Sequence, residues 1–135
     1  MTLVIDASAL VSAGVGTAES ASFLRARLVA EDCHAPYLID AELGNALRRQ
    51  VRRREIPAST AEVVLREAPR LIDHRYAHTG ELADAAWALR ENLTFYDALY
   101  VALASALNSP LLTLDQRLAG TAGLSCVVEM VGQGT

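Results

Sequence analysis

One stretch in the last third of the chain constrains the fold more than any other. Residues 97–107 form a run almost free of polar side chains, which predicts a helix packed inside the protein. Asn-Ser-Pro at 108–110 ends that helix, and 111–114 has the apolar composition of a strand buried on both faces. Because a helix leading into a parallel strand runs antiparallel to it, Asp97 and Asp115 fall at the same edge of the predicted sheet.

Short apolar runs alternate with helical patterns along the rest of the chain. This order predicts one α/β domain over residues 1–135, with a mainly parallel central sheet of about five short strands flanked by helices. We expect strands at 3–5, 33–38, 71–74, 111–114 and 124–128, the first of them central, and a frayed tail at 133–135. We expect Asp40 and Thr79 to cap two helices, and Ser59 with Glu62 to form a capping box that opens a third.

Charge is distributed unevenly. The net charge of −4 argues against a protein that coats nucleic acid by charge alone, yet all twelve basic residues are arginine and five of them fall within 48–54. One interpretation is a ridge that contacts phosphates, formed by Arg48, Arg49, Arg52 and Arg53. The other is a solvated helix end that suits the helix dipole. The sequence leaves both open.

Several classes of protein and site are not indicated. No apolar run approaches the roughly 20 residues that span a bilayer, and no signal-peptide pattern opens the chain, so we expect a soluble, cytoplasmic protein. Cys33 and Cys126 stand at no metal-ligand spacing, which predicts reduced thiols. His34, His74 and His78 form no i,i+4 pair and have no cysteine nearby, so we expect no zinc site.

Four carboxylates converge on one edge of the predicted sheet. Asp6 ends the first strand, Glu42 lies in the first turn of the helix after the second strand, and Asp97 and Asp115 flank the helix and strand described above. The negative charges of these four side chains repel one another, and the chain has no lysine to neutralise them. Mg²⁺ or Mn²⁺ is the natural counter-charge, although any one of these acids taken alone is better explained as a helix cap.

These residues sit in motifs that resemble those of PIN-domain ribonucleases, and with this length the chain most resembles the VapC toxins of type II toxin-antitoxin pairs. The motifs are Val-Ile-Asp-Ala-Ser-Ala-Leu at 4–10, Glu42 followed by Asn-Ala-Leu at 45–47, Phe-Tyr-Asp-Ala-Leu-Tyr-Val-Ala-Leu-Ala at 95–104, and Leu-Thr-Leu-Asp-Gln-Arg-Leu at 112–118. They cover nearly the whole chain in order. Arg117 departs from the pattern, since some members carry a further acid there.

The resemblance implies a Mg²⁺- or Mn²⁺-dependent endoribonuclease that inhibits translation until a cognate VapB-type antitoxin neutralises it. It implies a homodimer that forms a hetero-oligomer with the antitoxin. It assigns Asp6, Glu42 and Asp97 as metal ligands and Asp115 as a ligand or an orienting residue. Ser8 and Thr113 match supporting polar positions, the former beside Asp6 and the latter before Asp115.

Two other enzyme or signalling classes use aspartates at the edge of a parallel sheet. Haloacid-dehalogenase-type phosphotransferases need a second aspartate two residues after the first, where this chain has Ser8, and they need a lysine. Receiver-like signalling modules also need a lysine. The alternatives that stay open are a PIN-fold nuclease that processes RNA without an antitoxin, and a catalytically silent PIN-fold binding module.

Overall fold

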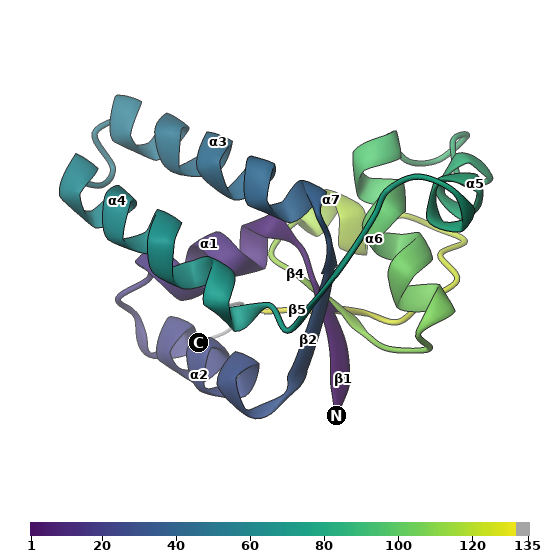
Figure 1. Ribbon diagram of the computed structural model, residues 1–135, viewed down its shortest axis with the longest axis horizontal. Coiled ribbons are helices and arrows are strands. Elements are labelled where there is room, and N and C mark those ends of the chain that lie inside the picture. Colours follow the sequence, from purple (N-terminus) through teal and green to yellow (C-terminus); the bar gives the residue numbers. More distant parts are fainter. Residues whose placement is uncertain (132–135) are drawn as a thin grey trace.

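The protein is built around one five-stranded sheet in which every pairing is parallel, and the computed structural model describes residues 1–131 (Figure 1). The strands are β1 (Thr2–Ile5), β2 (Asp32–Pro36), β3 (His74–Tyr76), β4 (Leu111–Thr113) and β5 (Val128–Met130). Their order across the sheet is β3-β2-β1-β4-β5, so the first strand is central as the sequence predicts. The tail expected at 133–135 lies outside the described residues.

Helices connect the strands and cover both faces of the sheet. Within the described residues they are α1 (Ala7–Val15), α2 (Glu19–Ala30), α3 (Leu38–Arg52), α4 (Ala58–Glu67), the 3₁₀ helix η1 (Ala68–Leu71), α5 (Glu81–Trp87), α6 (Phe95–Ala106) and α7 (Gln116–Ala119). Figure 1 shows α1 to α4 on one side of the sheet and α5 and α6 on the other, a three-layer arrangement. None of the helices in residues 1–131 has the length and apolar character needed to cross a membrane.

Strands β1 and β4 and helix α6 lie at the centre of the core, to which α1, α2, α3 and β2 also contribute buried side chains. Residues 3–5 and 111–113 are fully buried, and so is nearly all of 98–104, which confirms the buried helix and strand expected from the sequence. Helix α6 begins two residues earlier than expected because the Thr94 hydroxyl accepts the Asp97 amide and caps it. The helix ends as predicted, with Asn108 at a φ of 49° before Pro110.

Two predicted helix starts are wrong. Helix α3 begins at Leu38, and Asp40 lies in its first turn, where Arg75 of β3 donates to it at 2.7 and 2.9 Å. Helix α4 begins directly after Pro57, and no side chain caps it, so the predicted capping box is not formed. Pro57 precedes α4 as an extended residue, with a φ of −72° and a ψ of 153°, so the helix begins at Ala58.

The weaker strand predictions are displaced along the chain. Of the segment expected as a strand at 71–74, Leu71 ends the 3₁₀ helix η1, residues 72–73 are irregular, and only His74 belongs to a strand, β3 at 74–76. The last strand forms at 128–130 and not at 124–128. Helix α5 follows Gly80, whose φ of 65° suits glycine, and not a Thr79 cap. These segments are partly exposed, so their composition carries little of the apolar signal that identified the central strands.

Candidate acidic active site

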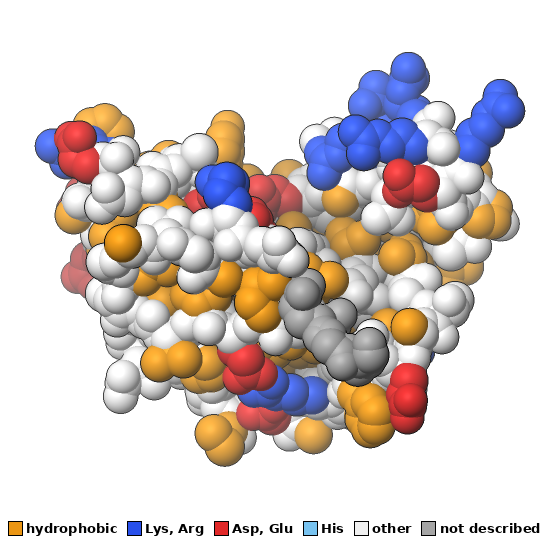
Figure 2. Space-filling model, turned by 180° about the vertical axis from the view of Figure 1, so that it is seen from behind, with side chains coloured by type: hydrophobic (Ala, Val, Ile, Leu, Met, Phe, Trp, Pro, Cys, Tyr) orange, Lys and Arg blue, Asp and Glu red, His pale blue; other side chains and the backbone are white. Residues whose placement is uncertain are grey.

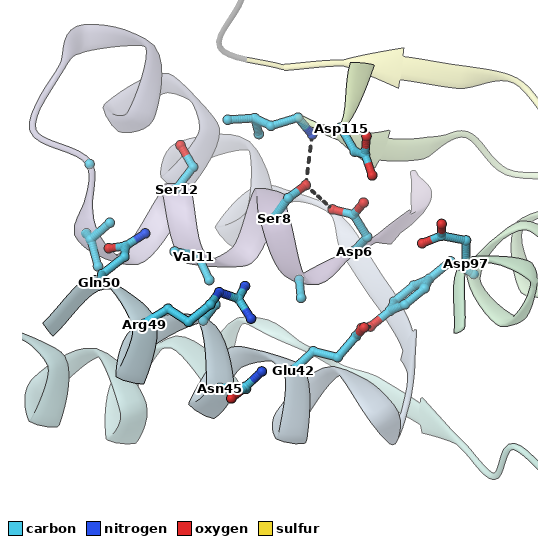
Figure 3. A pocket seen from close by; sticks show the side chains of 16 residues that line it. Asp6, Ser8, Val11, Ser12, Glu42, Asn45, Arg49, Gln50, Asp97 and Asp115 are labelled. Carbon is cyan, nitrogen blue, oxygen red and sulfur yellow. Dashed lines mark hydrogen bonds between the residues drawn. The ribbon is translucent and has the colours of Figure 1, made fainter. Parts of the chain in front are cut away.

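A cavity of about 600 Å³ opens at the edge of the sheet where β1 and β4 end (Figure 3). All four predicted carboxylates line it, together with Ser8 and Arg49: Asp6, Glu42, Asp97 and Asp115. They come from four different places: the end of β1, helix α3, the first turn of α6 and the residue after Leu114 that caps α7. Residues far apart in sequence therefore share one pocket.

Asp6 is the most buried of the four, with 7% of its surface exposed. It caps α1, because its Oδ1 accepts the Ala9 amide at 3.1 Å and the Ser8 hydroxyl at 2.6 Å. Its Oδ2 accepts the hydroxyl of Thr113. Burial raises the pKa of Asp6, these hydrogen bonds oppose the rise, and the charge of Asp115 adds to it.

Thr113 and Ser8 bind the ends of β1 and β4 together beneath the cavity. Thr113 is fully buried, and its hydroxyl accepts the Asp115 amide at 2.9 Å while donating to Asp6. The Ser8 hydroxyl donates to Asp6 and accepts the Leu114 amide at 2.9 Å. Both hydroxyls thus fix the carboxylate of Asp6 and the backbone that carries Asp115.

Glu42 is held by a residue that the sequence motifs did not single out for this role. The hydroxyl of Tyr100, buried in α6, donates to Glu42 Oε1 at 2.5 Å. Burial raises the pKa of Glu42, the Tyr100 bond and the charge of Arg49 lower it, and the charges of Asp6 and Asp97 raise it. Burial also raises the pKa of the Tyr100 hydroxyl, which therefore stays protonated as a donor.

Asp97 and Asp115 both form an ion pair with the side chain of Arg117. Arg117 Nη2 lies 2.9 Å from Asp97 Oδ2 and 3.2 Å from Asp115 Oδ2, while 65% of the arginine side chain is exposed. Asp115 also caps α7, accepting the amides of Arg117 and Leu118. Contact with Asp97 raises the pKa of Arg117. Sequence patterns do not indicate this contact, because only the turn after β4 brings Arg117 back over the acids.

The donor set suits a hard divalent cation. Every titratable side chain that lines the cavity, apart from Arg49 and Tyr100, is a carboxyl group, and Mg²⁺ and Mn²⁺ prefer such oxygen ligands. Burial is the main cause of the raised pKa of Asp6 and of Glu42, and the charges of neighbouring carboxylates add to both. The guanidinium of Arg117 on Asp97 and Asp115 is a stand-in for the missing positive charge.

Three of the arginines of 48–54 line two different hollows. Arg49 lines the acidic cavity, whereas Arg48 and Arg52 line a separate groove between α3 and α4. Arg53 caps the end of α3 and is exposed. Figure 2 shows basic side chains gathered at the upper right, on the arm where α3 ends, across a notch whose floor carries acidic side chains.

Residues 3–124 match the model of the PIN domain. Ribonuclease VapC1 of Mycobacterium tuberculosis is 51% identical over 128 residues, which cover 95% of this chain and 96% of that protein. Ribonuclease VapC9 of the same organism is 38% identical over 96% of this chain and 98% of its own length.

Solved structures share the fold at low sequence identity. A chain in the crystal structure of VapBC2 from Rickettsia felis, bound to a DNA fragment from its promoter, matches with a TM-score of 0.70 and 14% identity, covering 96% of this chain and 98% of that one. PAE2754 from Pyrobaculum aerophilum matches with a TM-score of 0.68 and 23% identity, covering 95% and 92%. By the match over residues 3–124 and the identity to relatives of equal length, the chain belongs to the PIN-domain family and, within it, to the VapC ribonucleases.

Proposed function

We propose that the protein is the toxin of a type II toxin-antitoxin pair, an endoribonuclease that hydrolyses RNA phosphodiester bonds with Mg²⁺ or Mn²⁺. The observation that carries the proposal is the single cavity lined by Asp6, Glu42, Asp97 and Asp115. No histidine is among its lining residues, so proton transfer by imidazole has no part in the proposal. The relatives named above are ribonucleases. We propose the cytoplasm as the place where this protein would cleave RNA.

Asp6, Glu42 and Asp97 would hold the cation directly, and Asp115 would either join them or orient them. When bound, Mg²⁺ or Mn²⁺ would supply positive charge that lowers the pKa of water and stabilises the charge developing on the scissile phosphate. Ser8 and Thr113 orient the Asp6 carboxylate and favour its ionised form through their hydroxyl donors.

Tyr100 has the matching role for Glu42, since its buried hydroxyl leaves one carboxylate oxygen paired and the other free to face the cavity. Arg117 has to leave Asp97 and Asp115 when a cation binds there, and its exposed side chain is then available to an RNA phosphate. Arg49, on the wall of the cavity, is placed to contact the same substrate.

The other arginines of α3 are proposed to contact RNA outside the cavity. Arg53 is exposed, and Arg48 and Arg52 are exposed at their own groove, on the same arm of the molecule as Arg49. A substrate that extends from the acidic cavity along this arm would meet them in turn. Replacing Arg52 and Arg53 with alanine should reduce the salt dependence of RNA affinity, and an unchanged slope would remove them from the interface.

We further propose a VapB-type antitoxin as partner and a homodimer of the toxin. A structural neighbour is a VapBC assembly, which supports the antitoxin. Phe23 and Val63 are 69% and 52% exposed on α2 and α4, and such apolar side chains suit a protein interface. A small antitoxin gene directly upstream, whose product co-purifies with this chain, would separate the toxin from a PIN-fold nuclease that processes RNA alone.

The test is cleavage of a total RNA pool by the purified, antitoxin-free protein with Mg²⁺, with Mn²⁺ and with EDTA. Asp97→Asn removes one carboxylate charge from the cavity, and Asp84→Asn is the matched control on the exposed face of α5. We expect discrete cuts that need metal, vanish in Asp97→Asn and persist in Asp84→Asn. No cleavage by a folded protein, or cleavage that Asp97→Asn leaves intact, would contradict the proposed catalytic site, and RNA binding without cleavage would indicate a binding module.

A further inference from the structure

A second cluster of metal-ligating side chains lies at the other end of the sheet. It consists of Asp32, His34 and His74, whose ligand atoms all lie within 4.8 Å of one another. Asp32 and His74 are the first residues of β2 and β3, whereas the acidic cavity lies where β1 and β4 end. All strands of a parallel sheet begin on one side of the sheet and end on the opposite side. The cluster is therefore separate from the proposed catalytic site.

Strand geometry explains why three residues distant in sequence meet. Asp32 and His34 are two residues apart on β2 and so project from the same face. His34 is the direct partner of His74 in the parallel register of β2 and β3. The two imidazole rings are stacked, with centroids 4.5 Å apart. Linear spacing led us to expect no zinc site, but strand register brings the histidines together.

Hydrogen bonds already point both imidazoles at one carboxylate. Nε2 of His34 lies 2.9 Å from Asp32 Oδ2, and Nε2 of His74 lies 3.0 Å from Asp32 Oδ1. The remaining nitrogen of His34, Nδ1, lies 2.6 Å from the hydroxyl of Tyr76. Within the described part of the chain, the ion pairs of Asp32 are these two alone, so no arginine neutralises it.

We propose that Asp32, His34 and His74 bind one divalent ion of the Zn²⁺ class, with solvent in the fourth position. Two imidazole nitrogens and one carboxylate oxygen are a ligand set that Zn²⁺ accepts and that differs from the all-oxygen set of the acidic cavity. The ion replaces the protons that the two Nε2 atoms now share with Asp32. His34 then carries its proton on Nδ1 and donates it to Tyr76, an outer hydrogen bond that orients a ligating histidine.

The site needs only a small adjustment at its exposed member. Zn–N distances of about 2.0–2.1 Å put two nitrogen ligands about 3.3 Å apart in a tetrahedral site, so the donor atoms have to draw closer. The side chain of His34 is 9% exposed and fixed by Tyr76, whereas that of His74 is 52% exposed and free to turn. The bound ion would tie the edge strand β3 to β2, in addition to the Arg75–Asp40 contact between β3 and α3.

The test uses the full chain and Co²⁺ as a spectroscopic substitute for Zn²⁺, in buffer with excess Mg²⁺ to occupy oxygen sites. Four-coordinate Co²⁺ absorbs visible light strongly, whereas six-coordinate Co²⁺ on carboxylates absorbs weakly. We expect one equivalent of Co²⁺ to give the strong bands and Zn²⁺ to remove them by displacement. His74→Ala, a change at an exposed side chain that preserves the fold, should weaken Co²⁺ binding at least about tenfold.

His78→Ala is the matched control, because His78 is also exposed but lies two residues beyond β3 and outside the cluster. It should leave the bands and the affinity unchanged. Absence of the strong bands in the unaltered protein would overturn the proposal. Binding that survives in His74→Ala, or that depends equally on His78, would also overturn it. The readout is absorbance and not RNA cleavage, so the result is independent of the proposed nuclease activity.

Discussion

Replacing Thr113 with valine isolates the hydroxyl that joins the two strands beneath the acidic cavity. Valine has nearly the same shape, so the fully buried site keeps its packing and loses the hydrogen bonds of the hydroxyl, which are the two with Asp6 and the Asp115 amide and a longer one, at 3.3 Å, with Ser8. The bond to Asp6 reaches a carboxylate and is worth about 1.5–3 kcal/mol, and the bond from the Asp115 amide is worth about 1 kcal/mol. We expect Thr113→Val to lower the free energy of unfolding by about 3 kcal/mol at pH 7.

Thr113→Ser is the matched control, because it keeps the hydroxyl and removes one buried methyl group. Thr113→Ser should lower the free energy of unfolding by about 1 kcal/mol. Urea unfolding of both variants in EDTA, followed by circular dichroism, measures the difference without any contribution from bound metal, and the slope against urea should not change. A valine variant no less stable than the serine variant would refute the reasoning, since it would mean that the hydroxyl contributes nothing to the strand junction.

Three further predictions concern the charges around the cavity. Asp6→Asn should raise the free energy of unfolding of the metal-free protein at pH 7, because burial raises the folded pKa of this carboxyl and makes its ionised form destabilising. The gain should disappear below the ordinary pKa of 3.8, where folded and unfolded chains both carry the proton, and urea unfolding against pH measures it. Tyr100→Phe should lower the free energy of unfolding by about 1–2 kcal/mol, because Glu42 loses its hydrogen-bond donor. The loss should grow as pH rises above 4.5, since the ionised form of Glu42 depends most on that donor. A loss that does not change with pH would contradict this. Arg117→Ala should tighten Mg²⁺ binding by about two- to fivefold in calorimetric titration, because exposed ion pairs hold their partners weakly, and unchanged affinity would mean that the arginine does not compete with the cation.

The sequence predicted those parts of the molecule that depend only on local composition and on the direction of the chain. The run at 97–107 identifies α6, since a helix buried on all sides has to be apolar all round. Asp6 and Asp115 could be placed together because the ends of parallel strands share one edge. Both arguments use only composition and the direction of the chain, and both carboxylates line the cavity.

What the sequence could not supply depends on register and on side-chain reach. The pairing of His34 with His74 follows from the alignment of β2 on β3, and the predicted position of that edge strand was itself displaced. Arg117 reaches Asp97 only through the short turn after β4. Asp40 has the residue type of a helix cap, but the contact with Arg75 decides its role. No pattern of apolar residues encodes these contacts.

The pairing of β1 with β4 also sets when the protein can become active during its synthesis. Thr113 and Asp6 are 107 residues apart, so β1 is made first but one of its edges stays bare until nearly the whole chain has left the ribosome. A nascent or truncated chain that stops before Leu111 carries three of the four carboxylates and lacks the strand that orients Asp6 and brings Asp115. Incomplete copies of the chain therefore lack the complete acidic cavity.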